Sequence, residues 1–237
     1  MTKALSIVMP VYNEAQGLEA AVDEVHAVLR ARGYDPEIII VDDASTDGTY
    51  ALACSIAARL PSVRAERHPR NLGPCSGLAT GARLAKHAWV LLLPADIAIP
   101  LEDVDVLWEA REQADIVVGY VAADAGLREP LRHLQSRLYA GLVNALFGLG
   151  VRQVNYVTLY PSRLFHAIEL TTEGVARHAE ILARGRRAGL SLTEVPLGYR
   201  RRQHGSATGN RPSVIAKTLW EILRLRVQLE LSQRHKA

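Results

Sequence analysis

The chain has 237 residues, 49% of them hydrophobic, and a formal net charge of +3, so it is long enough to bury the core of one domain. Aromatic residues make up only 5% of it, and the absence of helix-turn-helix, zinc-finger and RNP-like patterns argues against nucleic acid as a partner. No apolar run reaches the roughly 18 residues of a membrane span, and no secretory signal precedes the first apolar run. The two cysteines, Cys54 and Cys75, both lie in helical patterns, and so low a cysteine content is typical of a reducing compartment. We therefore expect a cytoplasmic protein.

The N-terminal half alternates short apolar runs with segments of helical periodicity. The runs that predict strands are Leu5–Val11, Ile38–Val41, Val63–Glu66, Ala88–Leu93 and Asp115–Gly119. A helix is predicted from the first strand to about Arg32, and another over Gly73–Lys86. Strands that alternate with helices of roughly 10–15 residues predict a parallel sheet covered on both faces. The fold class is therefore α/β.

The predicted helix Gly73–Lys86 carries glycines at positions 73, 77 and 81. A period of four places them on one helical face, which we expect to pack closely against the sheet or to lie near a diphosphate. They do not form a GxGxxG pattern after a strand, which argues against a dinucleotide-binding site.

The most informative polar residues follow the strand Ile38–Val41. Asp42 and Asp43 stand directly at its end, and the next three polar residues (Ser45, Thr46 and Asp47) are expected to cap the following helix. Ligands of open parallel sheets bind beyond the carboxyl ends of the strands. Two adjacent acids are costly there unless a cation or hydrogen-bond donors meet them. A nucleotide base, ribose hydroxyls and a divalent metal would meet them, whereas the alternative is a capped helix and a solvated turn.

Several motifs occur in the order found in one family. SIVMPVYNE, VDDASTDGT, the NLG of Asn71–Gly73 and LLLPADIAIP (Leu91–Pro100) together resemble the nucleotide-sugar-binding half of family 2 glycosyltransferases, which have the GT-A fold. TLYPSRLF (Thr158–Phe165), the segment His178–Gly205 and the basic GNRP (Gly209–Pro212) resemble the acceptor half of dolichol- or polyprenyl-phosphate sugar synthases. The resemblance covers about residues 4–230. It implies a single GT-A domain over 1–237, with a nucleotide-sugar-binding half at 1–120 and an acceptor half with a C-terminal helix at 121–237.

The resemblance implies a nucleotide-sugar donor and the residues that bind it. Carried over to the matching motifs, these are Pro10, Tyr12, Glu14, Asp42, Asp43, Asn71, Gly73, Ala95 and Asp96.

The expected metal site departs from the family pattern. Relatives carry a DAD-type pair of acids, whereas the matching triplet here is Pro94-Ala95-Asp96, with only the second acid. A hard cation can be held by one carboxylate, donor phosphates and water. Asp96 is therefore the expected catalytic and metal-binding residue, with Asp43 as a neighbour and Mg²⁺ or Mn²⁺ as the cofactor. Weakened metal binding or a degenerate site is the alternative.

The acceptor half supplies the expected phosphate ligands. Arg202 matches the arginine of the family's RxxG motif, which meets donor or acceptor phosphate and makes it an expected catalytic residue. Thr208 and Arg211 are expected to replace the family's serine-lysine pair. The whole set is Arg128, Arg132, Arg137, Arg202, Thr208 and Arg211, and a solvated arginine is the alternative at each single position.

Glu180 aligns with a glutamate of the family on the helix before Gly189. It is an expected catalytic residue that would orient the acceptor or act as base for a hydroxyl acceptor. Pairing with Arg184 one helical turn away is the alternative. His178 and His204 are expected to pack or hydrogen-bond rather than to catalyse.

Two amphipathic stretches lie in the second half. Leu131–Leu149 carries an apolar stripe with basic residues near its start, and Val214–Leu231 repeats the pattern. Basic amphipathic helices lie in membrane interfaces, although such stripes more often pack on the protein's own core. Peripheral membrane contact is left open for the first, and packing or a homodimer is favoured for the second.

The resemblance predicts an inverting hexosyltransferase that moves a sugar from GDP or UDP to polyprenyl or dolichyl phosphate. A phosphate acceptor is already an anion, so it needs positioning by arginine forks rather than a base. The alternatives are transfer to a soluble acceptor in natural-product or glycan biosynthesis, a non-catalytic nucleotide-sugar binder, and nucleotidyl transfer.

Overall fold

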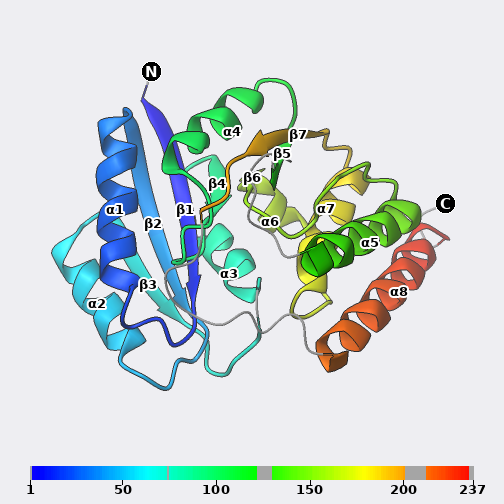
Figure 1. The fold of residues 1–237 in the computed structure, drawn as a ribbon, viewed down its shortest axis with the longest axis horizontal. Coiled ribbons are helices and arrows are strands. Elements are labelled where there is room, and N and C mark those ends of the chain that lie inside the picture. Colours follow the sequence, from blue (N-terminus) through cyan, green and yellow to red (C-terminus); the bar gives the residue numbers. More distant parts are fainter. Residues whose placement is uncertain (1, 74, 122–129, 201–211, 235–237) are drawn as a thin grey trace.

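The computed structural model describes residues 2–73, 75–121, 130–200 and 212–234, without the side chains of 130–133, 212–213 and 232–234. Figure 1 shows strands and helices alternating along most of the chain. The strands are β1 (Lys3–Val11), β2 (Tyr34–Asp42), β3 (Val63–Arg67), β4 (Trp89–Leu92), β5 (Ile116–Val121), β6 (Thr158–Pro161) and β7 (Leu192–Leu197). The helices are α1 (Leu18–Ala31), α2 (Thr49–Arg59), α3 (Ser76–Leu84), α4 (Val104–Ala110), α5 (Pro130–Phe147), α6 (Arg163–Ala167), α7 (Ala176–Arg187) and α8 (Pro212–Arg234).

One sheet joins all seven strands in the order β3-β2-β1-β4-β6-β5-β7. The pairs β1–β2, β1–β4, β2–β3 and β5–β7 are parallel, whereas β6 is antiparallel to both β4 and β5. The expected α/β class with a mostly parallel sheet is therefore confirmed. The strands β6 and β7 were not among those that the sequence patterns predicted.

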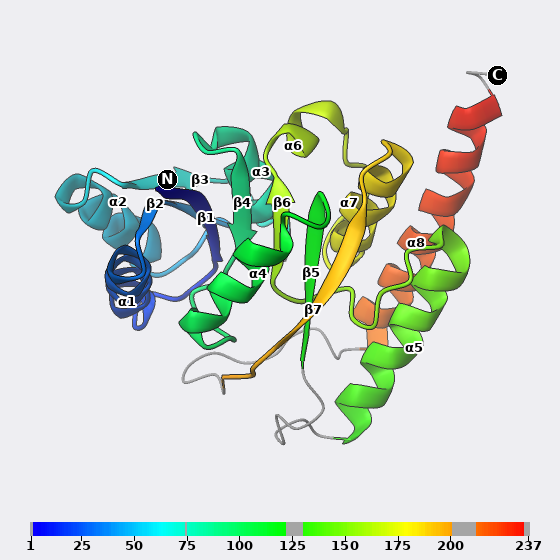
Figure 2. The same ribbon diagram turned by 90° about the horizontal axis from the view of Figure 1, so that it is seen from above.

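The central strands are buried on both faces because their apolar residues alternate between two cores. In β1, Leu5, Ile7 and Met9 face one core, and Val8 faces the other. The helices α1, α2 and α4 contribute to the first core, and α3, α6 and α7 to the second. Figure 2 shows α1 and α4 on one side of the sheet and α3, α6 and α7 on the other. Because helices cover the faces of the sheet, a binding site is expected at the ends of its strands.

The helix α3 packs tightly on the sheet through two of its glycines. A Cβ at Gly81 would lie 2.5 Å from Cγ1 of Val8, and a Cβ at Gly77 would lie 2.7 Å from that of Pro10. Close packing is thus confirmed for these two glycines. It is wrong for Gly73, which precedes α3 and has a φ of +82° that favours glycine, and for Gly73 the position near a diphosphate stays a prediction. Cys75 also precedes the helix, with a φ of 69°, so its expected helical position is wrong.

The helices α5 and α8 lie side by side at the end of the molecule opposite α1 and α2 (Figures 1 and 2). Ile222, Leu225 and Leu229 bury one face of α8, which confirms the packing predicted for this helix. A second apolar face is exposed. We use the name α5–α8 apolar surface for the exposed apolar residues of these two neighbouring helices: Leu134, Leu138, Ile215, Leu219, Trp220, Leu223, Val227 and Leu231. None of the helices in the described ranges combines the length and apolarity needed to cross a bilayer.

Candidate functional site

Backbone strain concentrates at one edge of the sheet. Within the described ranges, the non-glycine residues with positive φ are Asn13, Ala44, Cys75 and Ile97. Each lies in the connection that follows one of the strands β1, β2, β3 and β4. Such conformations are costly and cluster at functional sites. We call this place, where the four parallel strands end, the carboxyl edge.

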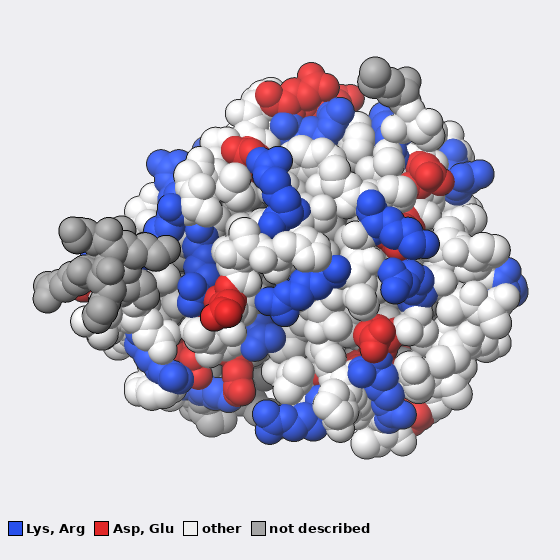
Figure 3. Space-filling model, turned by 180° about the vertical axis from the view of Figure 1, so that it is seen from behind, with Lys and Arg blue, Asp and Glu red and all other residues white. Residues whose placement is uncertain are grey.

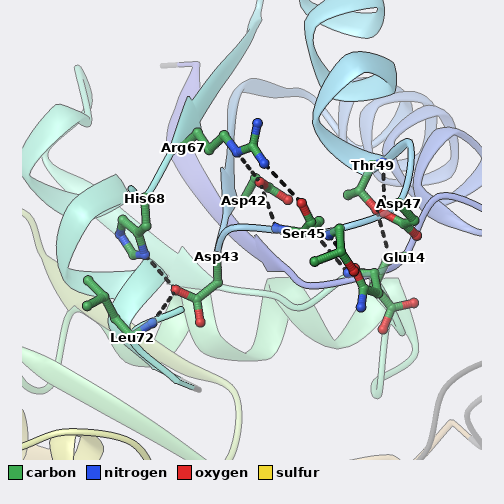
Figure 4. Close-up of polar contacts among 11 residues, drawn as sticks. Glu14, Asp42, Asp43, Ser45, Asp47, Thr49, Arg67, His68 and Leu72 are labelled. Carbon is green, nitrogen blue, oxygen red and sulfur yellow. Dashed lines mark hydrogen bonds and ion pairs between the residues drawn. The ribbon is translucent and has the colours of Figure 1, made fainter. Parts of the chain in front are cut away.

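Two loops of the carboxyl edge are bound to each other (Figure 4). The backbone N–H of Asn13 donates to Oγ of Ser45, and Thr46 N–H donates to Oδ1 of Asn13, both at 2.9 Å. Of the three residues expected to cap α2, one contacts its first turn. Asp47 accepts a hydrogen bond from the N–H of Thr49, the first residue of α2, at 2.9 Å. Ser45 and Thr46 bind the neighbouring loop instead, so the expected capping is met in part.

Asp42 is buried and is held by an arginine that the sequence analysis did not single out. Its carboxylate lies 3.2 Å from Nε of Arg67 and accepts a 3.1 Å hydrogen bond from the N–H of Ser45. Arg67 also donates to the carbonyl of Ser45 and lies over the ring of Tyr50. One guanidinium thus compensates a buried charge and fixes the loop after β2.

Asp43 organises the segment Asn71–Gly73. Its carboxylate accepts hydrogen bonds from the N–H groups of Leu72 and Gly73, both at 2.9 Å. Oδ1 of Asn71 accepts a second hydrogen bond from the N–H of Gly73 at 3.0 Å. The ring of His68 lies 2.8 Å from Oδ1 of Asp43, the oxygen that also accepts from Leu72 (Figure 4). The structure therefore brings Asp43 together with Asn71 and Gly73, from which it is far apart in the sequence.

Glu14, Ala95 and Asp96 line one small cavity of about 110 Å³. Arg200 lines it too, pairs with Glu24 at 2.5 Å, and donates its N–H to the carbonyl of Ala98 at 2.8 Å. The cavity therefore joins the β1–α1 loop, the end of β4 and the residue that precedes the segment 201–211. Among the described residues, no group of three His, Cys, Asp or Glu side chains is placed to hold a metal ion.

Of the other two expected donor residues, Pro10 lies in β1 against α3, and Tyr12 is 47% exposed beyond the strand. Arg137 is exposed on α5. The remaining acceptor-side candidates lie outside the described residues or have side chains outside them: Arg128, Arg132, Arg202, Thr208 and Arg211. His204 is also outside the described residues.

Glu180 is fully buried, and donors surround it. Both its carboxylate oxygens accept from the turn Thr171–Thr172, through two N–H groups and two hydroxyls at 2.7–3.0 Å. Arg184 donates at 2.8 Å, which is the ion pair predicted as the alternative. Burial raises the pKa of Glu180, but the hydrogen bonds from Thr172, Thr171 and Arg184 outweigh it and leave the pKa below its ordinary value. These contacts favour a structural role, and catalysis by Glu180 stays a prediction.

His178 packs as predicted. It is buried, its ring centroid lies 5.9 Å from that of Tyr160, and burial lowers its pKa to about 4.

The sequence analysis missed Asn13, Arg67, His68 and Arg200 as residues of the site. A signal for two of them existed, because Arg67 and His68 follow the predicted strand Val63–Glu66 at its carboxyl end. Their partners, Asp42 and Asp43, are about 25 residues away in the sequence, and only strand pairing brings them close.

Charge on the face seen from behind is mixed (Figure 3). Lysines and arginines are dispersed there among uncharged and acidic residues and do not form one continuous basic surface.

Comparison with solved structures agrees with this architecture. A mannosyl-3-phosphoglycerate synthase from Rubrobacter xylanophilus superposes with a TM-score of 0.71 and 18% identity, over 100% of this chain and 76% of that one. A glucosyl-3-phosphoglycerate synthase from Mycobacterium tuberculosis, solved with Mn²⁺ and UDP-glucose, has a TM-score of 0.68 and 18% identity, over 94% and 79% of the two chains. The expected GT-A fold is confirmed.

Sequence relatives point in the same direction. A dolichyl-phosphate beta-glucosyltransferase from Trichomonas vaginalis is 28% identical over 211 residues, which cover 82% of this chain and 65% of the relative. An undecaprenyl-phosphate 4-deoxy-4-formamido-L-arabinose transferase from Edwardsiella ictaluri is 31% identical over 207 residues, 86% of this chain and 62% of the relative. The chain thus spans less than two thirds of the length of either relative. Residues 6–163 match the sequence profile of glycosyl transferase family 2, and the chain belongs to that family.

Proposed function

We propose that the protein is an inverting glycosyltransferase that moves a sugar from UDP or GDP to a polyprenyl phosphate. One observation carries the proposal: Asp42 and Asp43 are each held by hydrogen bonds at the carboxyl edge of a family 2 chain, and Asp43 binds the segment Asn71–Gly73. Ligands of open α/β sheets bind at that edge. The named relatives, which transfer sugars to dolichyl and undecaprenyl phosphates, support the acceptor class.

The donor's nucleoside diphosphate would lie against the loops after β1, β2 and β3. Its base and ribose present donors that suit the carboxylate of Asp43, which backbone N–H groups already orient. Asp42, which is fully buried beside Arg67, would support the loop after β2. Pre-oriented groups lose little freedom when a ligand binds. This argues for recognition of the donor through a site that is built before binding.

Asp96 would hold the divalent cation. The half-buried carboxylate lines the same cavity as Glu14, and Mg²⁺ needs only one or two carboxylates when substrate phosphates and water complete its shell. Asp43 fits less well, because three donors already occupy its oxygens. When bound, such a cation offsets the charge that develops on a diphosphate leaving group. Mn²⁺ with UDP-glucose and Mg²⁺ with UDP in solved structures of the same fold support Mg²⁺ or Mn²⁺ as the cofactor.

The acceptor phosphate would be met by arginines of the second half. Arg202 is the principal candidate, with Thr208, Arg211 and the α5 arginines as further ones. An anionic acceptor needs no base, which agrees with the full set of hydrogen bonds at Glu180. Positioning is then the main task of this half.

The α5–α8 apolar surface would rest on a membrane that contains anionic lipid. Five of its members on α8 recur every fourth residue: Ile215, Leu219, Leu223, Val227 and Leu231. Trp220 stands beside this stripe with the Arg224 guanidinium over its ring, and Arg137 is exposed on α5. Aromatic and basic groups beside an apolar face are typical of interfacial helices.

Transfer to a soluble phosphorylated acceptor is the second candidate. The matched synthases of the same fold are named for glycosylated 3-phosphoglycerates. The same anionic-acceptor chemistry would serve a soluble phosphate.

A transfer assay tests the proposal. Purified protein, labelled UDP- and GDP-sugars, Mg²⁺ or Mn²⁺ and a short polyprenyl phosphate are combined, and label is extracted into an organic phase. We expect label there with one of the two donors, with an inverted anomeric configuration. Nucleotide binding with all label left aqueous would move the assignment to the soluble acceptor. Absence of both binding and turnover would contradict the glycosyltransferase proposal.

The metal assignment has its own variant. Asp96→Asn should abolish the response of turnover to Mg²⁺ and Mn²⁺. Glu112→Gln, at an exposed acid, is the matched control for Asp96→Asn. If Asp96→Asn keeps the parental metal dependence, Asp96 is not the metal ligand.

The phosphate assignment is tested by a second variant. Arg202→Ala should strongly reduce turnover without unfolding the protein.

A further inference from the structure

His68 is a buried histidine at the carboxyl edge for which the proposed chemistry has no use. It is the first residue after β3, is 5% exposed, and donates its N–H to the carbonyl of Asp42 at 2.9 Å. Its ring lies between two elements. Nδ1 is 2.8 Å from Oδ1 of Asp43, and Nε2 is 2.8 Å from Oγ1 of Thr80 on α3.

The contacts decide which ring nitrogen carries the proton. Asp43 accepts from the N–H groups of Leu72 and Gly73, so its oxygens act there as acceptors. The contact with Nδ1 is then a hydrogen bond only if Nδ1 carries a proton. In the neutral ring Nε2 then accepts from the hydroxyl of Thr80, so one tautomer satisfies both contacts.

This bond restrains the carboxylate of Asp43. The terminal torsion of an aspartate is broad and would otherwise let the oxygens rotate. Oδ1 of Asp43 is shared between His68 and the N–H of Leu72, while Oδ2 accepts from the N–H of Gly73. The orientation of the whole segment Asn71–Gly73 thus depends on a ring that is itself anchored to α3.

We propose that His68 is a positioning residue: through Asp43 it holds the segment Asn71–Gly73 in the conformation that receives the donor's nucleoside diphosphate. The inference rests on the proposed function in one respect, the identity of the ligand. The hydrogen bonds that support the inference do not depend on that function. His68 touches no substrate in this scheme and acts only through Asp43.

Three variants separate positioning from packing. In His68→Asn the amide nitrogen is as many bonds from Cα as Nδ1, so the hydrogen bond to Asp43 is retained. In His68→Gln the amide nitrogen corresponds to Nε2, so only the contact with Thr80 is retained. His68→Ala removes both. Melting temperatures of the Asn and Gln variants identify any difference in folding.

The first readout is the equilibrium binding of UDP and GDP by calorimetry. We expect His68→Gln and His68→Ala to raise Kd at least about tenfold, and His68→Asn to restore most of the lost affinity, because a hydrogen bond to a charged group is lost only in the first two. In turnover, KM for the donor should rise more than kcat falls. Parental affinity in His68→Gln, or equal losses in the Asn and Gln variants, would overturn the proposal.

The second readout needs no nucleotide. Amide hydrogen exchange at Leu72 and Gly73 should accelerate in His68→Gln and stay slow in His68→Asn. If the parent binds neither UDP nor GDP, the proposed function fails, and the exchange rates still decide whether His68 holds the segment. Unchanged exchange in His68→Gln would refute that role.

Discussion

Asp42 and Arg67 form an ion pair whose two members differ in exposure. The carboxylate is fully buried, whereas the side chain of Arg67 is 45% exposed. A buried carboxylate without compensation is costly, so the arginine matters chiefly for what it does to Asp42. The same guanidinium also holds the carbonyl of Ser45, and its loss would loosen the loop that precedes α2.

Arg67→Met should therefore lower the free energy of unfolding by about 1–3 kcal/mol, since Asp42 would lose its charged partner. Nucleotide binding should weaken as well. Urea unfolding and calorimetry measure the two effects. Arg59→Met is the matched control, because Arg59 pairs with the exposed Glu19 and Asp23, and this substitution should cost no more than about 0.5 kcal/mol. Equal losses in both variants would show that the pair with Asp42 adds nothing.

At the scale of elements, the contact between α3 and β1 depends on the absence of two side chains. Gly81→Ala would place a methyl group 2.5 Å from Val8 and should lower the free energy of unfolding by about 1–3 kcal/mol through overpacking. Gly141→Ala is the matched control. Nothing lies within 4 Å of a Cβ at Gly141 in α5, so this change should stabilise by about 0.5–1 kcal/mol. Thermal melting measures both, and the same sign for both would contradict the packing argument.

Glu180 links α7 to the turn Thr171–Thr172, and its lowered pKa makes that link sensitive to acid. A carboxyl whose pKa is lower in the folded state stabilises the protein above its ordinary pKa, 4.5 here. That contribution is lost as the pH falls through the lower folded value. Glu180→Gln should be less stable by about 2–4 kcal/mol at pH 7, and the difference from the parent should shrink in acid. Urea unfolding across pH measures it. Full stability with loss of turnover alone would favour the catalytic role instead.

At the scale of the whole molecule, exposed apolar side chains are gathered at one end. Eight of the ten large ones in the described part belong to the α5–α8 apolar surface. A patch of this kind marks a surface that binds something. The opposite end, with α1 and α2, lies at the other edge of the same sheet (Figure 1).

Leu223→Glu should therefore weaken binding to anionic lipid vesicles about 10- to 100-fold, because insertion of one such side chain is worth about 1.5–3 kcal/mol. Vesicle co-sedimentation measures this. Val106→Glu is the matched control, since Val106 is a similarly apolar, exposed residue on α4. If the parent binds no vesicles but forms a dimer in solution that Leu223→Glu breaks, the surface is a homodimer interface.

Local patterns in the sequence were sufficient for the first five strands. Runs of β-branched residues such as Ile38–Val41 predict strands wherever they occur, and the position of Asp42 and Asp43 at a strand end follows from that run alone. Helical periodicity is a local pattern too, and α1 ends at Ala31, within a residue of its predicted end at about Arg32. The family followed from motifs that are each contiguous in the chain.

Other features required the tertiary structure. The short strand β6 is antiparallel between β4 and β5, and no local pattern encodes that choice of neighbours. Glu180 is a candidate base by its alignment, but five donors from its own helix and from a turn eight to nine residues earlier surround it in the structure. Similarly, His68 acquires its meaning only beside Asp43 and Thr80. The sequence by itself determined which elements form and which family they belong to, because those signals are local. The tertiary structure decided which polar groups meet, because pairing of strands and packing of helices join residues that the chain keeps apart.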